Sequence, residues 1–277
     1  MKKALFIVGL ILTFSFTLKD NTLRISGSDT IYPFASKAAE IFMKKSDMEI
    51  IVKAGGSGAG IKDLIEGKVD IAMCSRELKP EEESQLRNKK INHFTLGYDA
   101  LAVIVHPSNK VEQLTKEQLS DIFTGKISNW KEVGEKNLDI IIYNRNSNSG
   151  TYDYVRNIVM NKQDFSENAL IVPTNKQIIK SVAQSQGAIA YIGLTYLNEK
   201  VKPLALSFPS KQFVKPSIET AVKGTYPLTR PLFFIYSSEI QEKINPLLMF
   251  IISNKGNQII KETGYIPTSP ELIVNKM

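Results

Sequence analysis

A cation and two hydroxyl groups stand close together in the middle of the chain. Arg145 lies four residues ahead of a Ser149-Gly150-Thr151 step, in the stretch NRNSNSGTYDYV. The pattern of this stretch predicts a helix that begins at the step. The first amides of a helix have no partner within the helix, and the helix macrodipole puts partial positive charge there. Because such a start binds oxyanions well, these residues predict an anion site.

Two further turns have a similar composition, at Gly27–Thr30 and Gly55–Gly60. In the first, Ser28 and Thr30 offer hydroxyl and amide donors. In the second, Ser57 stands among glycines, which let backbone amides approach an anion closely. The second turn lacks the spacing of a dinucleotide site and the lysine of a nucleotide-binding loop, so we favour a cradle for one small anion. For each turn taken singly, ordinary helix capping is the alternative.

The elements that must position these turns are short β-branched runs alternating with segments of helical period. The expected strands are residues 23–26, 50–52, 69–73, 100–105, 139–143, 188–192 and 232–236. The expected helices are residues 33–44, 61–66, 80–88, 116–123, 151–160 and 176–184. This alternation predicts an α/β fold with mostly parallel sheets. The turns at the carboxyl ends of such strands face the ligand crevice, so the three turns are expected to ring one pocket.

Composition narrows the class of protein. The 277 residues, 43% of them hydrophobic, suffice for two domains with real cores. The only cysteine, Cys74, excludes an intrachain disulfide. The net charge of +7 comes from scattered lysines, so it does not indicate nucleic-acid binding. His93 and His106 show no catalytic triad pattern, and no spacing indicates a metal site.

The N-terminus has the layout of a secretory signal. Lys2 and Lys3 precede an apolar run from Ala4 to Phe16, which is short for a membrane span. There is no cysteine near residue 20 to carry a lipid. We therefore expect residues 1–20 to be a signal peptide or N-terminal anchor, and the rest to be periplasmic or extracytoplasmic, either soluble or tethered by an uncleaved segment.

Three longer segments carry a resemblance to a known family. They are LTKEQLSDIFTGKISNWKEVG at Leu114–Gly134, GAIAYIG at Gly187–Gly193 and YPLTRPLFF at Tyr226–Phe234. With the three turns, they make the chain resemble the phosphate-binding proteins of ABC importers, the PstS type. The resemblance implies a two-lobed class II periplasmic-binding-protein fold, with two mixed, mostly parallel sheets flanked by helices and joined by two hinge strands. The implied lobe I is 21–99 plus 228–277, and lobe II is 100–227.

The resemblance also implies a function. It implies that a monomeric protein binds inorganic phosphate in the interlobe cleft and delivers it to membrane permease subunits, without a cofactor and without catalysis. The family's ligand-binding positions fall on Thr30, Ile31 through its amide, Ser57, Arg145, Ser149, Gly150 and Thr151, with Ser28 and Ser75 as neighbours.

One position departs from some family members. Where those proteins have an aspartate that accepts the proton of hydrogen phosphate, this chain has Arg76, and we expect this guanidinium near the same rim. A carboxylate that accepts this proton would repel sulfate and so discriminate the two anions. We expect Asp99 or Asp29 to take that role, or Asp99 to orient Arg76.

Other classes of function remain open at this stage. A binder of another oxyanion, such as sulfate or molybdate, would keep the donors and lack the proton acceptor. A secreted phosphatase-like hydrolase would use the same pocket but needs a nucleophile or base that the sequence does not reveal. A surface adhesin or signalling protein would reuse the fold and dock a partner protein.

Overall fold

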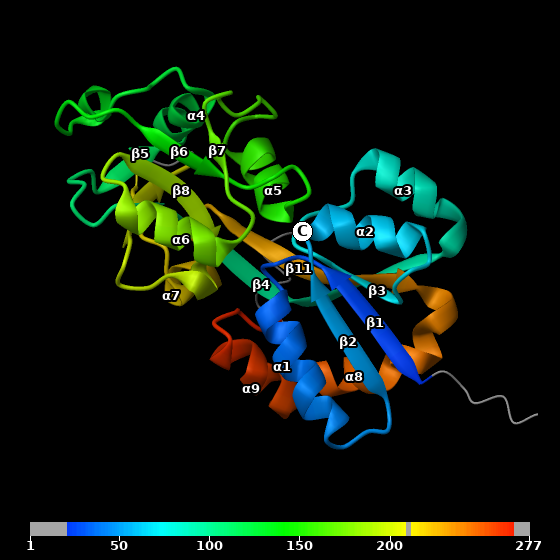
Figure 1. The fold of residues 1–277 in the computed structure, drawn as a ribbon. Coiled ribbons are helices and arrows are strands. Elements are labelled where there is room, and N and C mark those ends of the chain that lie inside the picture. The colour runs from blue at the N-terminus through cyan, green and yellow to red at the C-terminus, as the bar shows by residue number, and fades with distance from the viewer. Residues whose placement is uncertain (1–20, 209–211, 269–277) are drawn as a thin grey trace, which may run out of the picture.

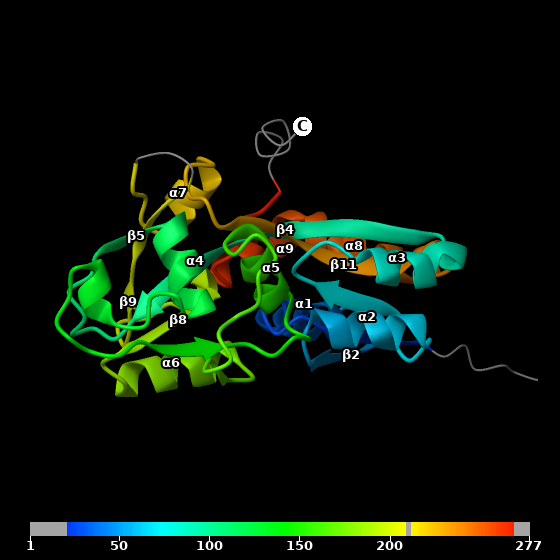
Figure 2. The ribbon, with the colours of Figure 1, turned by 90° about the horizontal axis from the view of Figure 1, so that it is seen from above.

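The computed structural model describes residues 21–208 and 212–268, which form two lobes side by side (Figures 1 and 2). The signal or anchor expected at residues 1–20 lies outside the described residues. In the first lobe, a central strand pairs in parallel with a strand on each side. These strands are β1 (Thr22–Gly27), β2 (Glu49–Ala54) and β3 (Ile71–Cys74). Because all three run in the same direction, the turns that follow them lie at one edge of the sheet.

Helices connect and flank the strands of the first lobe (Figure 1). They are α1 (Tyr32–Met43), α2 (Ser57–Ile65), α3 (Pro80–Leu86), α8 (Gln241–Ile252) and α9 (Asn254–Glu262), with short 3₁₀ turns at Arg87–Lys89 and Ser238–Ile240. Pro33 lies in the first turn of α1, where its missing amide hydrogen costs no helical bond. The apolar faces of α1, α8 and α9 bury the same core.

Two long strands cross between the lobes. In β4 (Ile91–Val105), the residues up to Ala100 pair antiparallel with β11 (Thr229–Ser237). From Leu101 onward, β4 pairs instead with β8 (Ala188–Gly193). The change of partner at Ala100 and Leu101 makes β4 a member of both sheets, so the strands form one hydrogen-bonded path through the molecule.

The second lobe is built on β8, which pairs in parallel with β6 (Ile141–Asn144). Its remaining strands are β5 (Gln113–Thr115), β7 (Leu170–Ile171), β9 (Lys202–Pro203) and β10 (Ala205–Ser207). Its helices are α4 (Lys116–Thr124), α5 (Gly150–Ile158), α6 (Asn175–Gln184) and α7 (Ile218–Val222), with 3₁₀ turns at Trp130–Val133 and Leu194–Tyr196.

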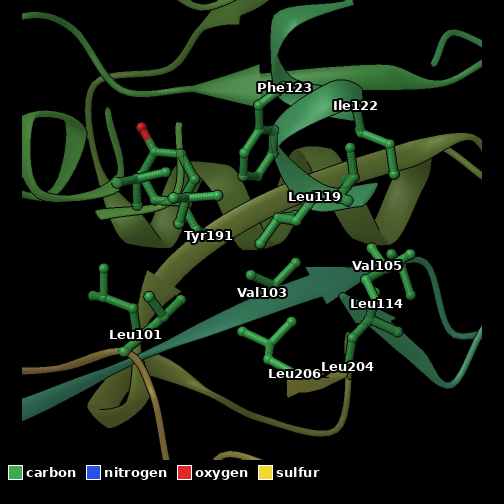
Figure 3. Packing of buried hydrophobic residues seen from close by; sticks show 14 of the residues in the cluster. Leu101, Val103, Val105, Leu114, Leu119, Ile122, Phe123, Tyr191, Leu204 and Leu206 are labelled. Carbon is green, nitrogen blue, oxygen red and sulfur yellow. The ribbon is translucent and has the colours of Figure 1, made fainter. Parts of the chain in front are cut away.

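Each lobe has its own buried core. In the second lobe, the leucine and valine side chains of β4 pack against Leu119, Ile122 and Phe123 of α4 and against Tyr191 of β8 (Figure 3). Trp130 belongs to this core, is fully buried and donates its indole Nε1–H to the carbonyl of Gly187 at 2.9 Å. Separate cores stabilise the lobes independently, which leaves the strands between them free to act as a hinge.

The α/β class, the two lobes and the two crossing strands predicted from the sequence are confirmed. Each expected strand and helix overlaps an observed one. The strand expected at 100–105 begins earlier, at Ile91, because the more polar first half of β4 forms hydrogen bonds with β11 along its length. The helices α8 and α9 were not predicted. Within the described residues, none of the helices combines the length and the apolar character that crossing a membrane requires.

Candidate functional site

The turn after β1 begins with a glycine that the packing requires. Gly27 has φ +135°, and a Cβ there would lie 2.3 Å from the carbonyl oxygen of Met73. This close approach lets the amide of Ser28 donate to that same oxygen at 2.9 Å. The turn is closed by the amides of Ile31 and Tyr32, which both donate to the Ser28 carbonyl at 3.1 Å. The Ile31 amide, expected to face an anion, therefore has an acceptor inside its own turn.

Three serine side chains from the first lobe meet at the edge of the sheet. Ser28 Oγ lies 3.0 Å from Ser75 Oγ, and Ser57 Oγ lies 3.3 Å from Ser75 Oγ. The amide of Ser75 also donates to Ser57 Oγ at 3.1 Å. All three residues are at most 2% exposed. The structure thus brings together the serines that follow or flank β1, β2 and β3.

The second lobe presents the start of α5 to these serines. Ser149 is the N-cap of α5, and its Oγ accepts from the amides of Thr151 and Tyr152. A Cβ at Gly150 would lie 2.3 Å from Ser57 Oγ and 2.6 Å from Ser75 Oγ, so glycine is needed for this approach. The predicted helix start therefore faces the first-lobe turns across the cleft.

Two further contacts connect the first-lobe turns to the residues at the start of α5. The amide of Gly58 donates to the Asn148 carbonyl at 3.0 Å, and Thr30 Oγ1 lies 3.3 Å from Thr151 Oγ1. Thr30 and Thr151 are each 1% exposed. The described structure is therefore closed, with the two sets of donors in contact.

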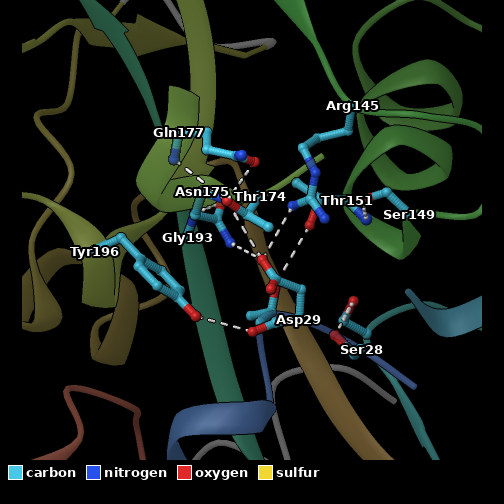
Figure 4. A network of polar contacts seen from close by, with 12 residues as sticks. Ser28, Asp29, Arg145, Ser149, Thr151, Thr174, Asn175, Gln177, Gly193 and Tyr196 are labelled. Carbon is cyan, nitrogen blue, oxygen red and sulfur yellow. Dashed lines mark hydrogen bonds and ion pairs between the residues drawn. The ribbon is translucent and has the colours of Figure 1, made fainter. Parts of the chain in front are cut away.

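Arg145 lies at this junction as a nearly isolated cation. The residue is 3% exposed, and its Nε and Nη1 have no hydrogen-bond partner among the described residues. The nearest carboxylate oxygen, Asp29 Oδ2, is 3.6 Å from Nη1 (Figure 4). Burial lowers the pKa of the Arg145 guanidinium, and Asp29 acts in the opposite sense. A buried cation with open donors favours an anionic ligand.

Asp29 bridges the lobes through groups that the sequence did not single out. Its Oδ2 accepts from Asn175 Nδ2 at 3.0 Å, and its carbonyl accepts from the hydroxyl of Tyr196 at 2.9 Å (Figure 4). Asn175 begins α6 and is fully buried. Buried asparagine at a helix start is ordinarily explained by capping, so only the three-dimensional arrangement identifies Asn175 and Tyr196 as neighbours of the site.

Arg230 is a charged residue that sequence reasoning missed. Its Nη2 lies 3.0 Å from Thr151 Oγ1, 3.2 Å from Thr30 Oγ1 and 3.1 Å from Asp99 Oδ2. The side chain is 0% exposed. A signal was present in the sequence, because an arginine in the apolar run YPLTRPLFF must find partners if the run is a buried strand.

The placement of Arg76 differs from the expectation. Its Nη1 and Nη2 each lie 2.7 Å from an oxygen of Glu82, and its Nε lies 2.8 Å from Asp153 Oδ2. Glu82 is at the start of α3 and Asp153 is on α5, so Arg76 forms an ion pair across the cleft beside the serine cluster. The expectation that Asp99 orients Arg76 is wrong, because Asp99 is paired with Arg230.

The histidines lie outside this arrangement. His93 packs edge-on against Phe233, and His106 Nδ1 is 2.8 Å from Ser108 Oγ in an exposed turn. In the part of the chain that the structure describes, no group of three histidine, cysteine, aspartate or glutamate side chains is placed to hold a metal ion.

Comparison with known proteins places this two-lobed anion-site architecture in a family. Residues 17–255 match the model of the PBP superfamily domain. The chain is 32% identical over 256 residues to Protein SphX of Synechococcus elongatus, covering 87% of this chain and 76% of that protein. It is 34% identical over 260 residues to the phosphate-binding protein PstS of Staphylococcus aureus strain USA300, covering 88% and 77%.

A solved structure supports the same assignment. A candidate phosphate ABC transporter substrate-binding protein from Clostridium perfringens, solved with bound phosphate, superimposes with a TM-score of 0.82. It is 32% identical and covers 90% of this chain and 100% of its own. The chain therefore belongs to the PBP superfamily and, within it, to the PstS family of phosphate-binding proteins.

Proposed function

We propose that this protein binds inorganic phosphate between its two lobes and delivers it to the permease of an ABC importer. The observation that carries the proposal is the buried guanidinium of Arg145, whose Nε and Nη1 lack hydrogen-bond partners within the described residues, beside hydroxyls from both lobes. A dehydrated dianion loses a large solvation free energy, which only a dense donor set with positive charge offsets. Membership of the PstS family supports phosphate as that dianion.

The proposed ligand set comes from both lobes. Lobe I, residues 21–99 with 228–277, contributes Ser28, Thr30, Ser57 and Ser75. Lobe II, residues 100–227, contributes Arg145, Ser149, Gly150 and Thr151. Because phosphate would contact both lobes only when they are closed, it stabilises the closed state by its differential affinity.

Asp29 is the proposed acceptor of the hydrogen phosphate proton. Its Oδ2 lies 3.6 Å from Arg145 Nη1, so it borders the cation expected to hold the anion. Asp99 Oδ2 is already paired with Arg230. A carboxylate at Asp29 would accept the ligand's proton and repel the fully ionised sulfate. Titration of Asp29→Asn and Asp99→Asn with both anions separates the candidates: only Asp29→Asn is expected to narrow the preference for phosphate.

The family and the N-terminal sequence support a proposal for where the protein works and with which partner. We propose that residues 1–20 direct export, that the protein works as a monomer outside the cytoplasm, and that it binds no nucleic acid. Its macromolecular partner is the permease, which receives phosphate when the lobes open.

Isothermal titration of the exported protein with phosphate, arsenate and sulfate tests the proposal. Phosphate and arsenate share geometry and protonation, so both are expected to saturate one site, with sulfate much weaker. Arg145→Ala is expected to weaken phosphate binding by more than about tenfold, or about 1.4 kcal/mol. The matched control is Arg156→Ala on α5, whose arginine pairs with the exposed Asp164. Wild-type affinity in a folded Arg145→Ala protein would refute the site.

A further inference from the structure

The pair formed by Arg230 and Asp99 lies where the lobes join. The two residues are direct register partners on β11 and β4. Two residues further along β4, at Leu101, the pairing partner of the strand changes from β11 to β8. The amide of Leu101 still donates to the Leu228 carbonyl at 2.9 Å, which holds the two crossing strands together at this level. The ion pair is therefore part of the hinge.

From the hinge, Arg230 reaches one proposed ligand residue in each lobe. Its Nη2 lies within hydrogen-bond distance of Thr30 Oγ1 and Thr151 Oγ1 as well as Asp99 Oδ2. The guanidinium carbon is 5.4 Å from the ring centroid of Tyr154, on α5. The threonine hydroxyls are 3.3 Å apart, so a single nitrogen holds both only in the closed arrangement.

The chemistry of these groups constrains the hydroxyl protons, because Asp99 Oδ2 and the two threonine oxygens share the two hydrogens of Arg230 Nη2 as acceptors. A guanidinium can only donate, whereas a threonine hydroxyl has one proton and accepts through its lone pairs. When Arg230 donates to a hydroxyl oxygen, that hydroxyl keeps its proton for another acceptor. Without Arg230, the carboxylate of Asp99 or the neighbouring hydroxyl would become the acceptor. The hydroxyls would then present lone pairs, instead of protons, to an anion.

We infer that Arg230 is a positioning residue for anion binding: held by Asp99, it orients the hydroxyls of Thr30 and Thr151 so that both donate to the ligand when the hinge closes. The inference rests on the proposed phosphate site. It assigns Arg230 a role that acts through the two threonines, and it assigns Asp99 the role of holding and neutralising Arg230 instead of binding the ligand.

A double-mutant cycle tests this inference. One arm is the paired change Arg230→Met with Asp99→Leu, which removes both charges because a single change would leave the other charge buried and unpaired. The other arm is Thr30→Val with Thr151→Val, and the fourth protein carries all four changes. Phosphate titration is run on each protein and on the wild type, with thermal melting in the absence of phosphate.

Each two-residue variant is expected to bind phosphate at least about tenfold more weakly, since donors to a charged ligand are lost or misdirected. The four-residue variant is expected to match the weaker of the two within about twofold, because Arg230 acts through the hydroxyls. Additive losses, or wild-type affinity in the arginine-aspartate variant, would overturn the inference. If the wild type itself does not bind phosphate, the proposed function is wrong. Failure of the positioning role alone would instead appear as normal phosphate binding by the wild type with additive losses in the variants.

Arg230→Lys gives a test that does not depend on replacing the ion pair. Lysine keeps a positive charge beside Asp99, but its flexible side chain does not hold a nitrogen at the fixed position that the planar guanidinium gives to Nη2. This variant is expected to melt like the wild type and to bind phosphate about fivefold or more weakly. Unchanged phosphate affinity in this variant would contradict a positioning role for Arg230.

Discussion

Gly150→Ala is the perturbation that separates lobe closure from folding. Gly150 is the first residue of α5, and a methyl group there would lie 2.3 Å from Ser57 Oγ and 2.6 Å from Ser75 Oγ. The clash is between lobes and not within α5. Alanine favours a helix over glycine by about 1 kcal/mol, so each lobe should fold at least as well as in the wild type.

The expected loss of phosphate affinity follows from the hydrogen bonds that the serines would lose. At least one hydroxyl must rotate away, and Ser57 Cβ, at 3.1 Å from the added methyl, must also shift. Losing one hydrogen bond to a charged ligand costs about 1.5–3 kcal/mol. The dissociation constant for phosphate should therefore rise about 10- to 150-fold. The thermal midpoint without phosphate should be unchanged or about 2 °C higher.

The assay is isothermal titration with phosphate, paired with thermal melting. Gly58→Ala is the matched control, since it also adds a methyl group at the start of a helix facing the other lobe. Its Cβ would meet Asn148 atoms only at 3.5 Å, an ordinary contact, so phosphate affinity should stay within about twofold of wild type. If Gly150→Ala binds phosphate as tightly as Gly58→Ala does, the reasoning about closure is refuted.

Further predictions concern the interlobe ion pair, the thiol and the indole. Asp153→Asn should weaken phosphate binding by about tenfold and speed phosphate release, because Asp153 pairs with Arg76 across the cleft. The control Asp164→Asn removes an exposed pair and should change neither the affinity nor the release rate. Burial raises the pKa of Cys74 to about 11, so iodoacetamide should label it only after unfolding. Since the unfolded thiol ionises near pH 9 while burial keeps the folded thiol protonated, the wild type should lose stability about 1.4 kcal/mol per pH unit faster than Cys74→Ala between pH 9 and 11, as measured by urea unfolding. Trp130 is buried within lobe II, so its emission maximum should not move on phosphate addition; a clear shift would place the motion inside that lobe.

The sequence was sufficient to predict the parts of the site whose positions depend on residues close together in the chain. Ser28, Ser57 and Ser75 each follow or flank a strand of one parallel sheet, and such positions meet at one edge. Ser149 and Gly150 begin a helix whose local pattern is recognisable. The structure brings these residues side by side, because strand direction and helix starts are encoded within a few residues, and their role as ligands stays a prediction.

The remaining parts depend on contacts between distant segments. Arg76 was expected at the anion pocket, but Glu82 and Asp153 engage its guanidinium, and the pairing with Asp153 depends on the closure of two lobes. Arg230 was hidden because its partners Thr30 and Thr151 are 200 and 79 residues away. Local periodicity contains no information about which lobe faces which side chain.

Two of the three buried arginines near the site share one electrostatic feature. Each is accompanied by a single carboxylate, Asp29 for Arg145 and Asp99 for Arg230. The contact is loose for Arg145, at 3.6 Å, and close for Arg230, at 3.1 Å. Nε and Nη1 have no hydrogen-bond partner among the described residues in either arginine, so it is the longer carboxylate distance that distinguishes Arg145 from Arg230 and agrees with its proposed role as ligand.

A crystal structure of the wild-type protein grown with phosphate tests the central claim most directly. The account predicts one tetrahedral anion within hydrogen-bond distance of Arg145 and Thr151 in one lobe and of Thr30 and Ser57 in the other. An anion that contacts only one lobe, or that lies away from Arg145, would contradict the account.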